Sequence, residues 1–156
     1  MNFVRTVLIA TVCALPSGSP AIADQIDKSR VPPIETYKLM LDGNRQNGWV
    51  QFRNYDGRQW IYFTAMQTLH CRLKEIRYSI NSDALDQRVE VAKCNKALPF
   101  SVSDDAINGG LIYKSMPLGT AQWVAVQVVW EDDSESEVQK VKVCEDVGES
   151  TCGIVE

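Results

Sequence analysis

The residues best suited to chemistry lie on a predicted hairpin whose two strands are joined by Asp56-Gly57. An Asp-Gly pair between two runs of β-forming residues favours a two-residue type I′ turn, and that turn sets the strand register. One face of the hairpin then carries Trp49, Gln51, Arg53, Trp60 and Tyr62. Aromatic and arginine side chains together are typical of binding surfaces. We therefore predict these five as ligand-binding residues that stack a sugar ring or an extended peptide.

Two structural interpretations of the same face compete with ligand binding. In the first, Arg53 covers Trp60 in a cation–π contact, and the cross-strand pairs only stabilise the sheet. In the second, the N-terminal arm of the chain packs on the face. The opposite face of the hairpin is predicted to be core, and it carries Val50, Phe52, Ile61 and Phe63.

An acidic run at residues 131–137 offers several carboxylates in seven residues. Calcium prefers several oxygen ligands, but the run lacks the D-x-D-x-D-G ladder that ends in a bidentate glutamate. The favoured interpretation is a hairpin turn with solvated charges. Asp104-Asp105, directly after Ser103, is interpreted as a turn for the same reason.

His70 is the only histidine, so a nucleophile–histidine–acid triad would have to include it. It lies next to Cys71, and the chain holds neither a Gly-x-Ser-x-Gly elbow nor a phosphate-binding glycine loop. We therefore predict no catalytic residue, no metal and no cofactor. A glycosidase needs only two carboxylates, so that class of enzyme stays open.

Residues 1–23 have the pattern of an export signal. Arg5 gives the positive start, residues 7–15 are uncharged and mostly apolar, and Ala21-Ile22-Ala23 is the small-x-small cleavage pattern. The apolar run is shorter than the roughly 20 residues that span a bilayer. We expect a periplasmic or secreted protein that begins near Asp24 and keeps no transmembrane segment.

Removal of 23 of the 156 residues would leave 133, enough for one domain with a core. The signal holds one basic and no acidic residue, so 15 Lys and Arg would face 20 Asp and Glu, a net charge of −5. Nucleic acids and anionic membranes need a basic footprint, so neither is an expected partner. A protein or a carbohydrate of the cell envelope is the expected one.

Five cysteines are present, and Cys13 falls within the signal. Lipid attachment there is disfavoured because Val12, rather than a small residue, precedes it. An exported chain with four further cysteines favours two disulfides, and nearest-neighbour pairing gives Cys71–Cys94 and Cys144–Cys152. A zinc site and a redox-active pair are the alternatives, and both lack a Cys-x-x-Cys pair.

The remaining chain divides into an extended arm at residues 24–33 and a single all-β domain at residues 34–156. Runs rich in Val, Ile, Tyr, Trp and Phe alternate with turn signals and predict strands. The predicted strands span residues 37–41, 49–55, 59–65, 73–80, 88–91, 111–115, 121–130 and 137–143. Short helical turns are possible at residues 66–74 and, with Ser82 as N-cap, at residues 82–86. This pattern favours an antiparallel β-sandwich of seven or eight strands.

Two segments resemble known β-domains. Residues 76–81 are similar to the "x-Tyr-Ser-x-Asn" strand of immunoglobulin-like and fibronectin-type-III-like accessory domains, and residues 118–136 are similar to their last hairpin. The resemblance covers about 65 residues and departs from antibody-type domains, which have a Cys…Trp…Cys core spacing. It implies an immunoglobulin-like fold and assigns no functional residue.

These observations together predict an exported, non-enzymatic binding or interaction module of the bacterial envelope. One alternative is a small periplasmic hydrolase, which would need a pocket with paired carboxylates. The other is a structural or assembly protein of the envelope, with residues 124–130 as its interface.

Overall fold

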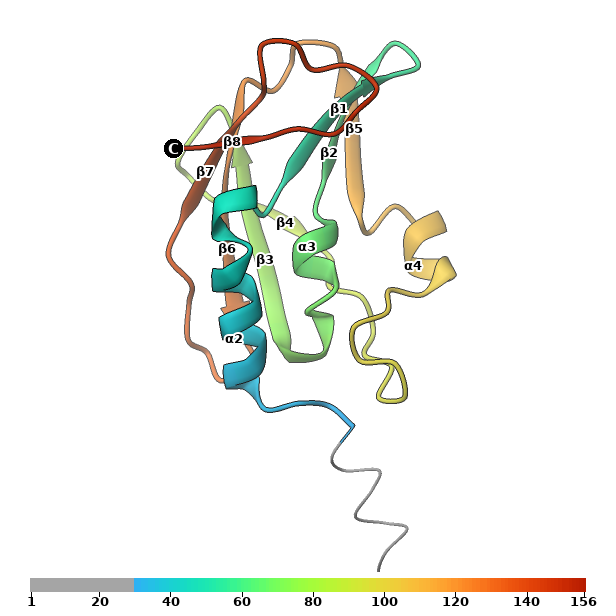
Figure 1. The fold of residues 1–156 in the computed structure, drawn as a ribbon, viewed down its shortest axis with the longest axis vertical. Coiled ribbons are helices and arrows are strands. Elements are labelled where there is room, and N and C mark those ends of the chain that lie inside the picture. The colour runs from blue at the N-terminus through green and yellow to red at the C-terminus, as the bar shows by residue number, and fades with distance from the viewer. Residues whose placement is uncertain (1–29) are drawn as a thin grey trace, which may run out of the picture.

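The computed structural model describes residues 30–156 and shows a mostly β chain with a few short helices (Figure 1). Its strands are β1 (Gln51–Tyr55), β2 (Arg58–Tyr62), β3 (Leu73–Ile80), β4 (Gln87–Val89), β5 (Tyr113–Pro117), β6 (Trp123–Trp130), β7 (Gln139–Lys142) and β8 (Ile154–Val155). Its helices are α2 (Ile34–Gly43), α3 (Thr64–Gln67), α4 (Asp104–Asn108) and the 3₁₀ turns η1 (Arg45–Asn47) and η2 (His70–Arg72). The strands form two antiparallel sheets, ordered β1-β2-β5 and β4-β3-β6-β7-β8.

The C-terminal segment links the two sheets. β8 pairs with β7, and a few residues earlier Cys152 exchanges main-chain hydrogen bonds with Phe52 of β1 (2.7 and 2.9 Å). Gly153 lies between the sheets, where an added Cβ would come within 2.8 Å of a Val141 methyl and 3.0 Å of the Val50 carbonyl oxygen. Only glycine therefore fits where the tail passes between β1 and β7.

One face of the five-stranded sheet is covered by two different elements. Its inward side chains from β3 and β6, such as Ile76 and Val126, belong to one buried cluster. Phe52 and Ile61 of the three-stranded sheet join that cluster, and so do Tyr37 and Leu41 of helix α2, which lies across β3 and β6 in Figure 1. Ile76 and Tyr78 of β3 are buried while Glu75 and Arg77 between them are partly exposed, and β6 lies at the centre of the sheet between β3 and β7.

The predicted strand at residues 37–41 is wrong, because this segment is the middle of helix α2. Alternating Tyr37, Leu39 and Leu41 look like a strand, yet Leu39 is 72% exposed while Tyr37 and Leu41 are buried. Residues four apart share a helix face, and the helix begins directly after Pro33. The spacing of the two buried residues therefore decides for the helix.

Two predictions on short helices are also corrected. Residues 82–86 form no helix, because the Ser82 hydroxyl accepts from the Ala84 N–H in a local turn instead of capping a helix. The segment after Ser103 was predicted to be a turn and is helix α4, whose Ala106 N–H donates to the Ser103 hydroxyl (3.3 Å). The helical turns predicted at residues 66–74 are present as α3 and η2.

Three buried glutamines connect segments that do not pair as strands. Gln59 accepts from the Ala121 N–H (2.8 Å) and donates to the Ala121 carbonyl (3.0 Å). Gln67 accepts from the Ala92 N–H and donates to the carbonyls of residues 90 and 111. Gln139 accepts from the Trp49 N–H (2.7 Å) and donates to the Arg45 carbonyl (2.8 Å). Each amide therefore acts like a piece of main chain and satisfies groups that have left water.

Both expected disulfides form. Cys71 of η2 is bonded to Cys94 in the segment after β4, and Cys144 after β7 is bonded to Cys152 in the tail. The second bond closes the loop that returns the chain to β1, so it helps to hold the link between the sheets. No helix of residues 30–156 is long and apolar enough to cross a membrane. The predicted signal, its Cys13 and the arm up to residue 29 lie outside the described residues.

Replacing Gln67 by leucine should destabilise the protein, because the Ala92 N–H and two carbonyls would stay buried without partners. The expected loss is about 3 kcal/mol in the free energy of unfolding, measured by urea denaturation. Gln87→Leu is the matched control, since Gln87 is exposed on β4 and its substitution should change the midpoint little. Equal stability of the two variants would contradict the structural role of Gln67.

Candidate functional site

The predicted hairpin is confirmed in turn and register. Asp56 and Gly57 have φ of 52° and 68°, the left-handed values of a type I′ turn. Arg53 pairs with Trp60, and Gln51 pairs with Tyr62. The side chains predicted as core are fully buried, namely Val50, Phe52, Ile61 and Phe63. The other face of the hairpin therefore points away from the main core.

Trp49 does not belong to this open face, and its predicted exposure is wrong. It is only 1% exposed, its indole N–H donates to the Leu41 carbonyl (3.0 Å), and the Arg45 guanidinium lies 5.6 Å from its ring. β1 begins two residues later, after Gly48 has turned the chain with φ of 79°. The strand alternation consequently stops before Trp49, which packs below helix α2.

The open face extends across the whole three-stranded sheet. β5 pairs with β2 so that Tyr113 lies opposite Tyr62 and Ser115 opposite Trp60. We call the resulting surface the aromatic face, formed by Arg53, Tyr55, Arg58, Trp60, Tyr62 and Tyr113, with Gln51 at its border. Tyr55 follows from the hairpin alternation, whereas Tyr113 is reached only through the pairing of β2 with β5. That pairing joins segments some 50 residues apart, so no local pattern could have predicted it.

The aromatic rings of this face contact one another edge to face. The Tyr113 ring lies 5.0 Å from the Trp60 ring and 6.3 Å from the Tyr62 ring, centroid to centroid. The Trp60 indole N–H donates to the Tyr55 carbonyl (3.1 Å). The predicted contact of Arg53 over Trp60 is wrong, because the Arg53 guanidinium lies over the Tyr55 ring at 4.5 Å. The rings are half-buried and held in place, while part of each stays open to solvent.

The charges of the two sheets differ. Arg53, Arg58 and Lys114 are the charged residues of β1, β2 and β5, and no acidic residue lies in these strands. Within residues 30–156, none of the three forms an ion pair. Every basic side chain of the five-stranded sheet is ion-paired in contrast, for example Arg77 with Glu75 (2.8 Å). In a chain of net charge −4, the aromatic face is therefore a basic surface.

A hollow of about 230 Å³ borders the aromatic face on the side of the C-terminal tail. Its lining residues are Trp49, Gln51, Tyr62, Thr64, Ala65 and Thr151. Three of the five predicted ligand-binding residues therefore meet at this hollow, with Trp49 as part of its wall. The described part of the predicted arm lies elsewhere, since the Arg72 guanidinium binds the carbonyls of Val31 and Pro32.

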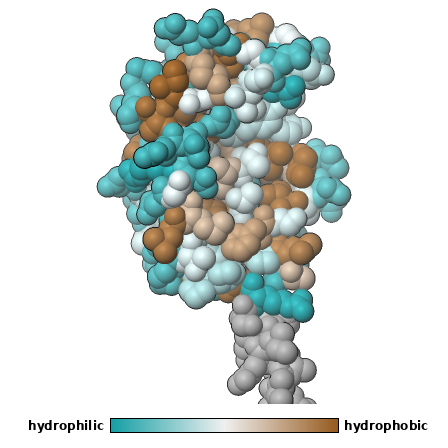
Figure 2. Space-filling model, in the orientation of Figure 1, coloured by the Kyte–Doolittle hydropathy of each residue, from teal (hydrophilic) through white to brown (hydrophobic). Residues whose placement is uncertain are grey.

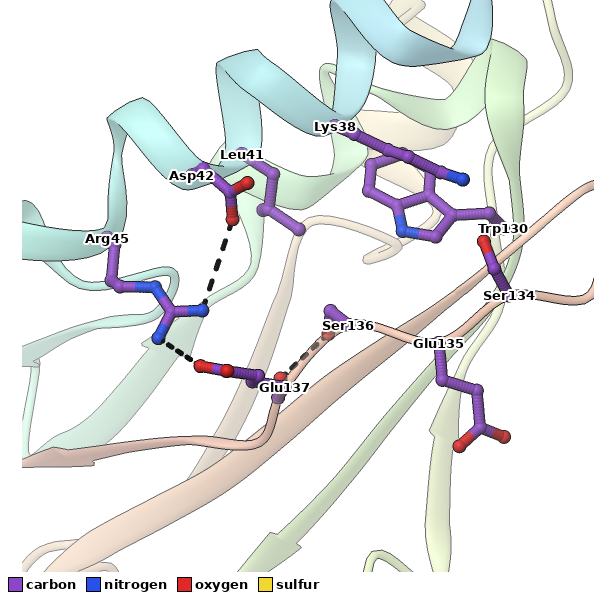
Figure 3. Close-up of a pocket in the computed structure, with 9 residues that line it drawn as sticks. All are labelled: Lys38, Leu41, Asp42, Arg45, Trp130, Ser134, Glu135, Ser136 and Glu137. Atoms are coloured by element: carbon purple, nitrogen blue, oxygen red, sulfur yellow. Dashed lines mark hydrogen bonds and ion pairs between the residues drawn. The ribbon is translucent and has the colours of Figure 1, made fainter.

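The acidic run forms the second candidate site, a cavity of about 320 Å³ between helix α2 and the loop after β6 (Figure 3). Leu41 and Trp130 line it together with Arg45, which bridges Asp42 and Glu137. Each acidic residue of the run has a basic partner from another element. These pairs are Glu131 with Arg72, Asp132 with Lys38, Asp133 with Lys74, Glu135 with Arg77 and Glu137 with Arg45. Within residues 30–156, no cluster of His, Cys, Asp and Glu could hold a metal ion.

Basic partners also shift the pKa of two carboxyl groups, Asp132 in the acidic run and Glu75 on β3. Hydrogen bonds from Lys38 and Ser134 lower the pKa of Asp132 to about 2. Burial alone would raise the pKa of Glu75, but hydrogen bonds from Arg77 and Arg88 outweigh it and leave that pKa below its usual value. The run thus fastens the β6–β7 loop to α2 and β3.

His70 is buried beside the Cys71–Cys94 disulfide. Its Nδ1 lies 2.7 Å from the Gln67 carbonyl oxygen. A carbonyl only accepts, so Nδ1 carries the hydrogen in this arrangement. His70 is therefore bonded to the same short helix whose Gln67 connects β4 to β5.

The apolar side chains on the surface are scattered. The exposed large ones lie on different elements, such as Leu39 on α2, Leu98 in a loop and Ile107 on α4. On the face shown in Figure 2, hydrophobic residues lie in several separate groups among hydrophilic ones. Single exposed apolar residues are ordinary on soluble proteins, so this face does not identify an interface.

Replacing Asp132 by asparagine tests the ion pairs of the run. The folded pKa of Asp132 lies below the ordinary value of 3.8, so the stabilisation that this carboxylate gives is present above about pH 4 and is lost as the pH falls toward 2. The variant should melt below the wild type at pH 7 and together with it at pH 2. Asp146→Asn is the matched control, because Asp146 is exposed and forms no ion pair within residues 30–156. A constant difference between variant and wild type across this range would contradict the assignment.

Comparisons with protein-family models, with curated proteins and with solved structures found no match. The geometry and charge of this chain are therefore the basis for a proposal about its function.

Proposed function

We propose that this protein is an exported, non-enzymatic binding module of the cell envelope, and that its aromatic face holds an extended ligand. The observation that carries the proposal is a set of half-exposed rings and arginines on one face of the three-stranded sheet. Trp60 is its centre, since it contacts Tyr113 and lies between the two arginines, Arg53 opposite and Arg58 two residues before.

Pre-arranged rings support binding because they lose little side-chain freedom when a ligand stacks on them. Aromatic and arginine residues carry most of the binding energy in interfaces of known energetics. The edge-to-face contacts and the Trp60–Tyr55 hydrogen bond fix the rings before a ligand arrives. Cations without an ion pair are free to bind an anionic group on the ligand.

Export and the finer fold belong to the same proposal. The signal pattern of residues 1–23 and the two disulfides support a periplasmic or secreted location. A sandwich-like, immunoglobulin-like packing is supported by the shared core of the two sheets, with helix α2 in place of further strands. The proposal does not include the Cys…Trp…Cys core of antibody domains.

The two alternatives have less support. The hydrolase alternative needs paired carboxylates in a pocket, and the carboxylates of the cavity in Figure 3 are engaged in ion pairs. A general acid must hold a proton, and guanidinium partners favour its loss. The assembly alternative placed its interface at residues 124–130, which are buried between β3 and β7.

The proposal is tested by pull-down of partners from envelope extract with the wild type and with Trp60→Ala. Loss of a central aromatic contact costs about 2 kcal/mol, which corresponds to roughly 30-fold weaker binding. Trp123→Ala is the matched control, because Trp123 is a half-buried tryptophan of the other sheet with the Lys140 ammonium 5.0 Å from its ring. Equal capture by wild type and both variants, with melting checked for each, would overturn the role of the aromatic face.

A further inference from the structure

β5 is the edge strand of the three-stranded sheet, and its outer side is unpaired. Among residues 30–156, only β2 pairs with β5. The Phe63 N–H donates to the Ile112 carbonyl (2.8 Å), and antiparallel pairing alternates from there. Lys114 and Met116 therefore bond to β2, while the N–H and C=O groups of Tyr113 and Ser115 point outward. Such an edge is a template for one more strand.

Basic side chains lie on both sides of this edge. Arg58, on the aromatic face, donates from Nε to the Ser115 hydroxyl (3.3 Å), so its guanidinium reaches over β5. Lys114 points to the opposite face, because it pairs with the inward-facing Ile61. Neither side chain has an ion pair within the described residues. A strand added here would therefore lie between two unpaired cations.

We propose that the partner is an extended acidic peptide segment that pairs with the outer edge of β5, an inference that rests on the proposed function of the aromatic face. The main chain of the segment bonds to Tyr113 and Ser115. Its acidic side chains bind Arg58 on one face and Lys114 on the other, and an apolar side chain packs on the Tyr113 ring. Main-chain bonds give affinity in this mode, and side-chain contacts give specificity.

Two other partners fit this edge less well than an acidic peptide. A second copy of the chain would bring Arg58 and Lys114 close to the same residues of its partner, and lysine and proline on edge strands disfavour self-pairing. An acidic polysaccharide matches the cations and the rings. It lacks the alternating N–H and C=O groups of a peptide main chain, so it leaves the edge of β5 unpaired.

The test uses three probes and measures their affinity for the full-length mature protein by fluorescence anisotropy. The probes are a labelled peptide of repeated Glu-Glu-Val, which as a strand carries glutamate on both faces, the same peptide with lysine in place of glutamate, and labelled polygalacturonate. The glutamate peptide should bind at least about tenfold more tightly than the lysine peptide, since like charges repel at such an interface. Equal binding of both peptides, or no binding of the glutamate peptide, would overturn the inference.

Two variants separate the edge from the face. Ser115→Pro removes an outward N–H without touching the bonds to β2, and it should weaken the glutamate peptide about tenfold or more. Ser115→Ala also loses the hydroxyl but keeps that N–H, so it serves as the matched control, and Ser115→Pro should bind the glutamate peptide at least about tenfold more weakly than Ser115→Ala. Unchanged binding by Ser115→Pro would overturn edge pairing.

Charge reversal supplies the second arm of the test. Arg58→Glu and Lys114→Glu should each weaken the glutamate peptide about tenfold, whereas Lys96→Glu, at an exposed loop residue without an ion pair, should leave it unchanged. Failure of the inference is distinguishable from failure of the proposed function. If the glutamate peptide does not bind while polygalacturonate binds and depends on Trp60, the aromatic face is kept as a binding site and the peptide strand is rejected.

Discussion

The fold depends on one constraint: a main-chain N–H or C=O group can be buried only where it has a hydrogen-bond partner. Three glutamine side chains supply such partners. Gln59, Gln67 and Gln139 are each at most 4% exposed, and each amide both accepts from and donates to the main chain. An unpartnered buried group costs about 1–3 kcal/mol, so these bonds decide where irregular segments can enter the core. They hold the start of β6, the segments around β4 and β5, and the turn before β1.

The position of the aromatic face follows from this arrangement. The tail fastens β1 to β7, Gln59 fastens β2 to the start of β6, and Phe52 and Ile61 bury the inner side of the small sheet. The outer side of the small sheet carries the aromatic rings together with Arg53 and Arg58. The acidic run meanwhile neutralises basic residues of α2, η2 and β3. The unpaired cations of the sheets are therefore those of the three-stranded sheet.

Much of the small sheet could be predicted from sequence, because local rules determine it. The Asp56-Gly57 turn fixes the register of the hairpin, and alternation then assigns Phe52 and Ile61 to the core. Helix α2 was missed because Tyr37, Leu39 and Leu41 fit both a strand and a helix. The positions of Trp49 and Tyr113 could not be predicted from local sequence for another reason. Trp49 is positioned by its contact with helix α2, and Tyr113 by the pairing of β5 with β2.

Amide hydrogen exchange of β5, followed residue by residue by NMR, tests the central claim that the small sheet presents an open face and an open edge. The account predicts slow exchange at Lys114 and Met116, whose N–H groups bond to β2, and fast exchange at Tyr113 and Ser115. Addition of the glutamate peptide should slow the exchange at Tyr113 and Ser115 alone. Slow exchange at Ser115 in the free protein would show that the edge is already covered and would contradict the account.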